Sequence, residues 1–214
     1  MAGCPNFLGM TYLHLFASAA LTTVFAKYPL FDISKTIPLA FLILFLLVLF
    51  GLLFVLMAMS PGPLKYIIFA LYLAMMGTLL SQVDDRLEQK GIVFEVVATV
   101  AGIFLAMTAL GFYDKDNLLG FGPYLLAALL GLILARILLI FVVVADGPSE
   151  TAQQTNTLLS VVGTILFSVF VAYDTQLLKQ MAKYCKGNPD YINASLGLYL
   201  DIVNLVSNVS DVYE

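Results

Sequence analysis

The segment Leu196-Gly-Leu-Tyr-Leu-Asp-Ile-Val-Asn204 places one aspartate, Asp201, in the middle of an otherwise apolar run. A second segment, Val169-Phe-Val-Ala-Tyr-Asp-Thr175, does the same with Asp174. A carboxylate at the centre of a membrane-spanning helix costs roughly 2.5 kcal/mol or more, so an acidic residue in such a place points to function. Two of them near the end of one chain indicate a site that handles protons or cations.

The composition of the whole chain indicates a membrane protein. Hydrophobic residues make up 61% of the 214 residues and charged residues 11%, and the mean hydropathy is +0.98. A soluble domain of this length does not need so much apolar surface. The small, mixed net charge of −4 excludes a nucleic-acid-binding surface. The two cysteines, Cys4 and Cys185, match no disulfide framework and no metal-ligand spacing, so we expect free thiols.

Apolar stretches separated by short polar breaks predict an all-α integral membrane protein. The first six are near or above the ~20 residues needed to cross the hydrocarbon, and the first lacks the basic start of a signal peptide. The length allows one domain, residues 1–214. We therefore predict a single seven-helix bundle with helices at about 7–26, 36–59, 64–81, 92–112, 118–145, 155–178 and 191–208.

The seventh predicted helix differs from the others because it is short and carries many polar residues. At about 100° per residue its polar positions share one narrow face. Lipid would not tolerate that face, because unsatisfied amides and carboxyls cost several kcal/mol there. We expect this helix in the middle of the bundle, with its polar face lining a pathway or meeting a partner carboxylate. The residues of that face are Asn193, Gly197, Asp201, Asn204 and Asn208.

Two carboxylates a few Å apart in a low-dielectric interior cannot both ionise at low cost, so they share a proton. Protonated, such a pair is a hydrogen-bonded clasp between two helices. Ionised, it repels itself unless a cation enters, and Ca²⁺ prefers oxygen ligands of this kind. Protons and Ca²⁺ should therefore compete for Asp174 and Asp201. The alternative is a pair that only joins two helices.

Two strings resemble the signature segments of the Bax inhibitor-1 family, also called the transmembrane Bax-inhibitor-motif family. They are Ser168-Val-Phe-Val-Ala-Tyr-Asp-Thr-Gln-Leu177 and Ala194-Ser-Leu-Gly-Leu-Tyr-Leu-Asp-Ile-Val-Asn-Leu205. Residues 7–26, with Thr11-Tyr-Leu-His-Leu-Phe16, resemble the first helix of the compact bacterial or viral members.

The resemblance implies a seven-helix fold with a central last helix. It also implies a pH-sensitive calcium leak, promoted by acid, with a role in calcium homeostasis and cell-death suppression. Asp174 and Asp201 match the paired aspartates that sense protons and bind Ca²⁺ in the family.

One departure from the family concerns the closed state. Bacterial members can carry a basic residue at the loop end of the second helix, where it bonds the aspartate of the sixth helix as a latch. Here that stretch is Leu56-Met-Ala-Met-Ser-Pro-Gly-Pro63, with no Arg or Lys. The latch is therefore absent, replaced by Lys65, or supplied by another helix. Arg136 qualifies only if it faces inward rather than reaching toward the membrane interface.

Smaller expectations concern three further residues. Glu95 is either part of the pathway or a solvated carboxylate at a helix start. Asn204 is expected to be a hydrogen-bond partner of Asp201. A lone histidine in an apolar helix, His14, is more often a helix-contact residue than a pH sensor.

Other function classes share some of these sequence features with a channel. An intramembrane aspartyl protease fits Tyr173-Asp174, but its Gly-x-Gly-Asp motif is absent before Asp201. A proton-coupled transporter is an alternative, although the two halves show no inverted repeat. A non-conducting protein that restrains cell death through membrane-protein partners is another. The sequence contains no phosphate-binding loop, nucleophile triad or redox motif, so we expect no enzyme and no cofactor beyond Ca²⁺ as the bound or permeant ion.

The expected location follows from the family and from charge. We expect an integral protein of the endoplasmic reticulum or Golgi in a eukaryotic cell, or of the inner membrane in a bacterium. The lysines that follow the sixth predicted helix favour a cytoplasmic N-terminus. They are Lys179, Lys183 and Lys186.

Overall fold

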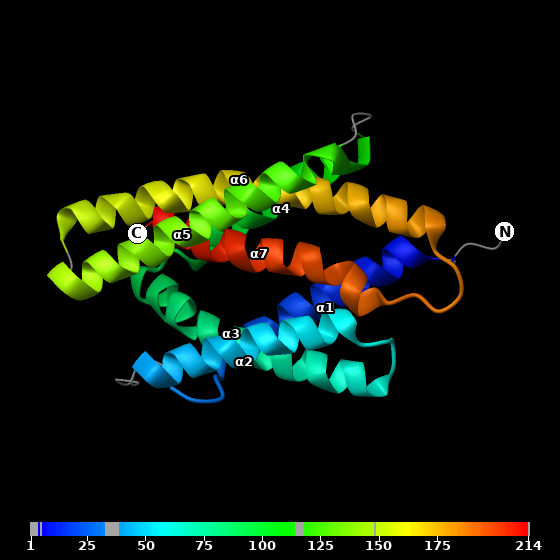
Figure 1. The fold of residues 1–214 in the computed structure, drawn as a ribbon, viewed down its shortest axis with the longest axis horizontal. Helices are drawn as coiled ribbons and strands as arrows, with labels where there is room; N and C mark the ends of the chain where they lie inside the picture. Colours follow the sequence, from blue (N-terminus) through cyan, green and yellow to red (C-terminus); the bar gives the residue numbers. More distant parts are fainter. Residues whose placement is uncertain (1–3, 5, 33–38, 114–117, 148, 214) are drawn as a thin grey trace. The chain divides into compact units, whose positions relative to one another are not determined.

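A computed structural model describes residues 4, 6–32, 39–113, 118–147 and 149–213. Over these residues the chain forms seven α-helices and one short 3-10 helix, with no strand, which confirms the all-α prediction (Figure 1). The elements are α1 (Phe7–Lys27), α2 (Leu39–Ala58), α3 (Pro63–Lys90), α4 (Val93–Tyr113), η1 (Leu118–Phe121), α5 (Gly122–Asp146), α6 (Glu150–Tyr184) and α7 (Tyr191–Tyr213).

The helices differ in their capacity to cross a membrane. Among the described residues, six helices, α1 to α6, are long and apolar enough to span one. The last helix, α7, is not among them, because aspartate, asparagine and serine interrupt its apolar residues. Buried positions nevertheless occupy most of the circumference of α7 between Ile192 and Ser210. This agrees with the prediction that the polar-faced last helix is shielded from lipid.

Several helices are longer than the hydropathy pattern predicted. The charged residues 84–90, which lie between the predicted helices 64–81 and 92–112, are the last turns of α3, which Gly91 caps with a left-handed φ of 69°. The end of α1 stabilises these turns, because Lys27 pairs with Asp84 and Glu88. At its other boundaries, α6 begins at Glu150 rather than 155 and ends at Tyr184 rather than 178, and α7 continues to Tyr213 rather than 208.

The helices extend beyond their predicted ends because hydropathy marks only where a helix leaves the hydrocarbon. A polar helix continues until its backbone is capped. At the start of α6 the cap is Ser149, whose Oγ accepts a hydrogen bond from the Ala152 amide at 3.1 Å. The predicted start of the second helix, residues 36–38, lies outside the described residues.

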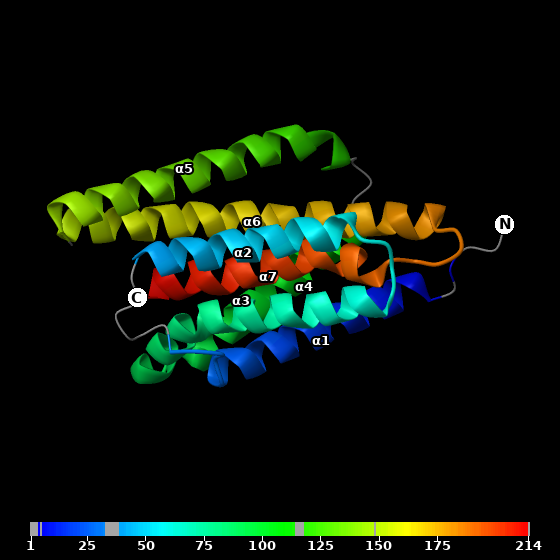
Figure 2. The same cartoon turned by 60° about the horizontal axis from the view of Figure 1, so that its bottom comes forward.

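Two compact units divide the chain. Unit 1 comprises Met1–Gly91 and Gln180–Tyr199, and so contains α1, α2, α3 and the first part of α7. In it α1 and α3 run side by side (Figure 2). Their closest approach is at Gly77, where an added Cβ would lie 2.5 Å from the Thr22 carbonyl oxygen. Only glycine permits this helix spacing, and Thr22 in turn bonds the Tyr199 hydroxyl of α7 at 2.7 Å.

Unit 2 comprises Ile92–Lys179 and Leu200–Glu214, and so contains α4, η1, α5, most of α6 and the second part of α7. In Figure 2, α5 lies along α6. The two run antiparallel, because Gly122 at the start of α5 contacts the Tyr173 hydroxyl late in α6. Close to the start of α6, Ser160 bonds the Arg136 side chain of α5. Unit 2 carries both aspartates that the sequence singled out.

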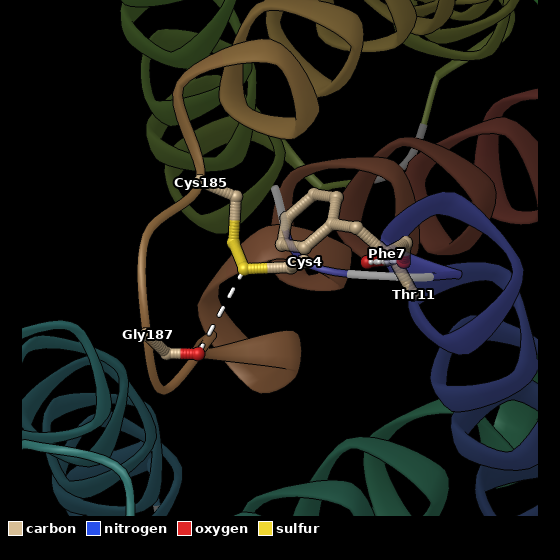
Figure 3. Close-up of a disulfide and its surroundings, with 5 residues drawn as sticks. All are labelled: Cys4, Phe7, Thr11, Cys185 and Gly187. Carbon is tan, nitrogen blue, oxygen red and sulfur yellow. Dashed lines mark hydrogen bonds between the residues drawn. A yellow bond between two sulfur atoms is a disulfide. The ribbon is translucent and has the colours of Figure 1, made fainter. Parts of the chain in front are cut away.

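The expectation that both cysteines are free is wrong. Cys4 and Cys185 form a disulfide that joins the stretch before α1 to the loop between α6 and α7 (Figure 3). Their Cα atoms lie 5.6 Å apart and 181 positions separate them in sequence. Cysteine spacing cannot reveal such a pair, because tertiary packing in unit 1 alone brings the two residues together.

Candidate functional site

The most unusual polar group in unit 2 is Asp201, in the second part of α7. The residue is only 4% exposed. Its Oδ2 atom is buried and has no hydrogen-bond partner in the part of the chain that the structure describes. A buried carboxylate oxygen without a partner is costly, so a proton or a cation at this atom would relieve a real penalty.

The second aspartate, Asp174 of α6, is half-buried and lies near Asp201. The antiparallel register of α6 and α7 explains this proximity. Farther along the same helices, Ser160 donates to Asp211 at 3.0 Å, and Gly163 contacts Asn208. Because the helices are antiparallel, moving forward along α6 from these contacts corresponds to moving backward along α7. This register puts Asp174 and Asp201 on neighbouring turns. The structure thus brings together the two residues that the sequence singled out.

The chemistry open to this pair follows from its surroundings. A proton shared between Asp174 and Asp201 would give the Asp201 Oδ2 atom a hydrogen bond and remove one negative charge. A divalent cation would neutralise both carboxylates. Among the described residues there is no group of three or more His, Cys, Asp or Glu side chains that could hold a metal ion. A cation at the pair would therefore complete its shell with backbone carbonyls, amide oxygens or water.

The remaining residues of the α7 face have different roles. Asn204, expected to bond Asp201, donates its amide to the Leu200 carbonyl at 2.8 Å. Asn193 and Gly197 lie in the part of α7 that belongs to unit 1. Asn193 donates to the Met57 carbonyl at 3.1 Å, and its Oδ1 is buried with no partner among the described residues.

Arg136 faces inward from α5 and forms the centre of a polar cluster. Its Nη2 donates to Asn208 Oδ1 at 2.7 Å and to Ser160 Oγ at 2.9 Å. Its Nη1 lies 3.3 Å from Asn156 Oδ1 and 3.5 Å from Asp211 Oδ2. We call these five residues the Arg136 cluster. The Arg136 guanidinium faces inward, as a latch residue must. Its acidic partner, however, is Asp211 of α7 and not the aspartate of α6 that the latch bonds in the family.

Lys65, the other latch candidate, is fully buried in unit 1. Its Nζ lies 2.5 Å from Asp190 Oδ2 and donates to the Met59 carbonyl at 2.8 Å. Asp190 in turn accepts a hydrogen bond from the Asn193 amide at 3.1 Å, so it caps the start of α7. Lys65 therefore holds the first turn of α7.

Sequence reasoning missed Asp190 and Asp211. The signal for Asp190 was present, because an aspartate three residues before an amide at a helix start is typical of a cap. Asp211 gave a weaker signal: it lies ten positions after Asp201, on the same helical face.

Two smaller expectations agree with the observed geometry. Glu95 is exposed in the first turn of α4, as a solvated helix-start carboxylate would be. The His14 ring stacks on Tyr191 with centroids 5.2 Å apart, and its Nδ1 lies 2.7 Å from the Met10 carbonyl oxygen. His14 thus has the contact role expected of it.

Comparison with known proteins places the chain in a family. Residues 4–211 match the family model described as "Inhibitor of apoptosis-promoting Bax1". An uncharacterised protein of Borreliella burgdorferi is 34% identical over 143 residues, which cover 64% of this chain and 58% of that protein. The inner membrane protein YbhL of Escherichia coli K12 is 34% identical over 144 residues, with coverages of 64% and 58%.

An uncharacterised membrane protein of Streptococcus pyogenes serotype M3 is 26% identical over 159 residues, which cover 73% of this chain and 66% of that protein. The matched part of this chain thus spans 58% to 66% of the length of these relatives. The family model, in contrast, matches almost the full chain. The chain therefore belongs to the Bax inhibitor-1 family of membrane proteins.

Proposed function

We propose that the protein is a pH-sensitive cation leak, with Ca²⁺ as the permeant ion, and that Asp174 and Asp201 form its proton- and calcium-binding site. One observation supports this most strongly. The Asp201 Oδ2 atom is buried and has no hydrogen-bond partner among the described residues, and a second carboxyl group lies near it on the neighbouring helix. Such an arrangement is unfavourable when both groups are charged and nothing lies between them.

The mechanism follows from the competition between protons and Ca²⁺. When both carboxylates are ionised, the pair binds Ca²⁺ strongly, and an ion held strongly leaves slowly. Binding of one proton removes a negative charge and weakens the hold on Ca²⁺. Acid conditions therefore increase the leak in this scheme, as the family resemblance also implies. Conduction stops only when the Asp174–Asp201 pair has lost so much negative charge that it no longer attracts Ca²⁺.

The location and physiological role are part of the same proposal. A calcium leak of this type would act in the bacterial inner membrane, or in the endoplasmic reticulum or Golgi of a eukaryotic cell. In the eukaryotic compartments it would lower the stored calcium and restrain cell death, which agrees with the name of the matching family.

The test is calcium entry into liposomes that contain the purified protein, measured as a function of external pH. We expect the wild-type flux to rise as the pH falls. Asp201→Asn and Asp174→Asn remove one titrating group each and should flatten this pH dependence. Asp85→Asn is the matched control, because Asp85 is an exposed carboxylate of α3, and it should keep the wild-type profile.

Three outcomes separate this proposal from its rivals. The same pH profile in wild type and in both site variants would remove Asp174 and Asp201 from the mechanism. Calcium movement coupled to a counterflow of protons would favour a transporter. Absence of flux from correctly folded protein would favour a non-conducting interaction protein.

A further inference from the structure

The polar face of α7 does not end at Asp201. Within unit 2 it continues through Asn204 and Asn208 to Asp211, at intervals of three, four and three residues. These intervals keep all four side chains on one side of a helix. The last two of them, Asn208 and Asp211, contact the guanidinium of Arg136. The polar face that starts at the aspartate pair therefore ends at a fixed positive charge.

Arg136 links three helices at this point. It belongs to α5 and bonds Asn156 and Ser160 of α6 as well as Asn208 and Asp211 of α7. The backbone of α6 also makes room for the arrangement. An added Cβ at Gly163 would lie 2.2 Å from Asn208 Oδ1, the atom that accepts the shortest hydrogen bond from Arg136.

On its other side the Arg136 cluster borders an open groove of about 680 Å³ between α5 and α6. One wall is apolar and belongs to α5. The α6 side presents Glu150, Gln153 and Asn156, again at intervals of three. Asn156 both lines this groove and bonds Arg136. The guanidinium thus stands between the groove and the polar face of α7.

The orientation of Arg136 is notable in a helix that mostly faces outward. Leu132 is the single buried residue of α5, all of whose residues the structure describes. The Arg136 side chain, at 31% exposed, points instead toward Asp211, which is 11% exposed. A fixed positive charge beside a polar helix face repels cations, so a cation can move along that face only when the charge moves away.

We propose that Arg136 is an electrostatic gate on the cation route of unit 2, closed in this structure by its contacts with Asn208 and Asp211. The inference rests on the proposed cation leak and adds the residue that closes it. When the guanidinium withdraws, Asn208 Oδ1 and the Asp211 carboxylate become oxygen ligands for the passing cation. The groove between α5 and α6 is then the outer end of the route.

Charge-changing variants in the liposome assay test the gate. Arg136→Gln removes the charge and keeps a hydrogen-bonding side chain, so we expect calcium flux at neutral pH to rise roughly tenfold. Arg136→Lys keeps the charge and should stay close to wild type. Asp211→Asn removes the counterion of Arg136 but leaves the guanidinium bonded to Asn208 and Ser160. Its flux should therefore not rise.

A purely structural role predicts something else, because both Arg136→Gln and Asp211→Asn would then disturb the cluster and change the flux in the same direction. That result would overturn the gate. Equal flux in wild type and Arg136→Gln, with the pH dependence of the aspartate pair intact, would overturn the gate and leave the proposed function standing. Absence of flux from every folded variant would overturn the proposed function and the gate with it.

A second experiment covers the case in which Arg136→Gln does not fold. Both cysteines of the chain lie in the disulfide, so Arg136→Cys introduces one free thiol. Modification with a positively charged thiol reagent should restore the closed state, whereas a neutral reagent of the same size should leave the flux high. Equal flux after both reagents would show that charge at this position does not gate the route.

Discussion

The two ends of α7 are held in similar ways but with different strength. At the first turn, in unit 1, the buried Lys65 pairs with Asp190, and the disulfide of Cys185 fixes the preceding loop. At the last turns, in unit 2, the partly exposed Arg136 pairs with Asp211 beside an open groove.

Each end thus combines one basic residue from another helix with one aspartate on or next to α7. Only the first end is also tied covalently. The difference indicates an anchored start and an end that can change its contacts, which is where a gate is expected.

Loss of the Lys65 charge should have the largest effect on stability. Lys65→Ala leaves the Asp190 carboxylate largely buried without its partner, and breaking a buried pair in this way costs about 3–5 kcal/mol. Unfolding in detergent measures the change. The control is Lys90→Ala, at an exposed position at the end of α3, which should be close to neutral. A loss below about 1 kcal/mol in Lys65→Ala would show that the first turn of α7 does not depend on this pair.

The disulfide should have the next largest effect. Removing it by Cys4→Ser should lower the free energy of unfolding by about 2–4 kcal/mol, because the unfolded chain is no longer constrained. A reducing agent should lower the midpoint of wild-type unfolding and leave that of Cys4→Ser unchanged. If the reductant acts equally on both proteins, the two cysteines are not joined in the folded chain and the anchor is weaker than described.

At the other end of α7, Gly163→Ala tests the fit of the Arg136 cluster. The added methyl group would displace Asn208 and should cost about 1–3 kcal/mol. Because Asn208 holds Arg136 in place, the same variant should also raise calcium flux. Gly102→Ala is the matched control, since an added Cβ at this helical position of α4 meets nothing within 4 Å. Similar stability of the two variants would mean that α6 and α7 are not closely packed at Gly163.

Much of the fold could be predicted because a bilayer imposes simple rules on a sequence. Hydropathy located the six long helices, and the polar face of α7 marked it as shielded from lipid. The helix ends were misplaced where charged residues such as Asp84 and Glu88 extend a helix beyond its apolar part. Hydropathy contains no information on those turns, because their stability comes from pairing with Lys27 on another helix.

The candidate site was predicted in part for the same reason. An aspartate in an apolar run is conspicuous, so the sequence singled out Asp174 and Asp201, and the register of α6 and α7 explains why they lie on neighbouring turns. The partners of Lys65 and Arg136 could not be found in this way. Asp190 and Asp211 lie at helix ends, where an acidic residue is ordinary, and only tertiary packing decides which base each one meets. The disulfide was missed for the same reason, because only tertiary packing brings Cys4 and Cys185 together.

The central claim is that one proton and one calcium ion compete for the Asp174–Asp201 pair. It is tested most directly by measuring proton release when Ca²⁺ is added to the purified protein in weakly buffered, mildly acidic detergent solution. The account predicts release of about one proton per bound Ca²⁺ from wild type and from Asp85→Asn, and almost none from Asp201→Asn. Equal proton release from all three proteins, or calcium binding by wild type without any proton release, would contradict it.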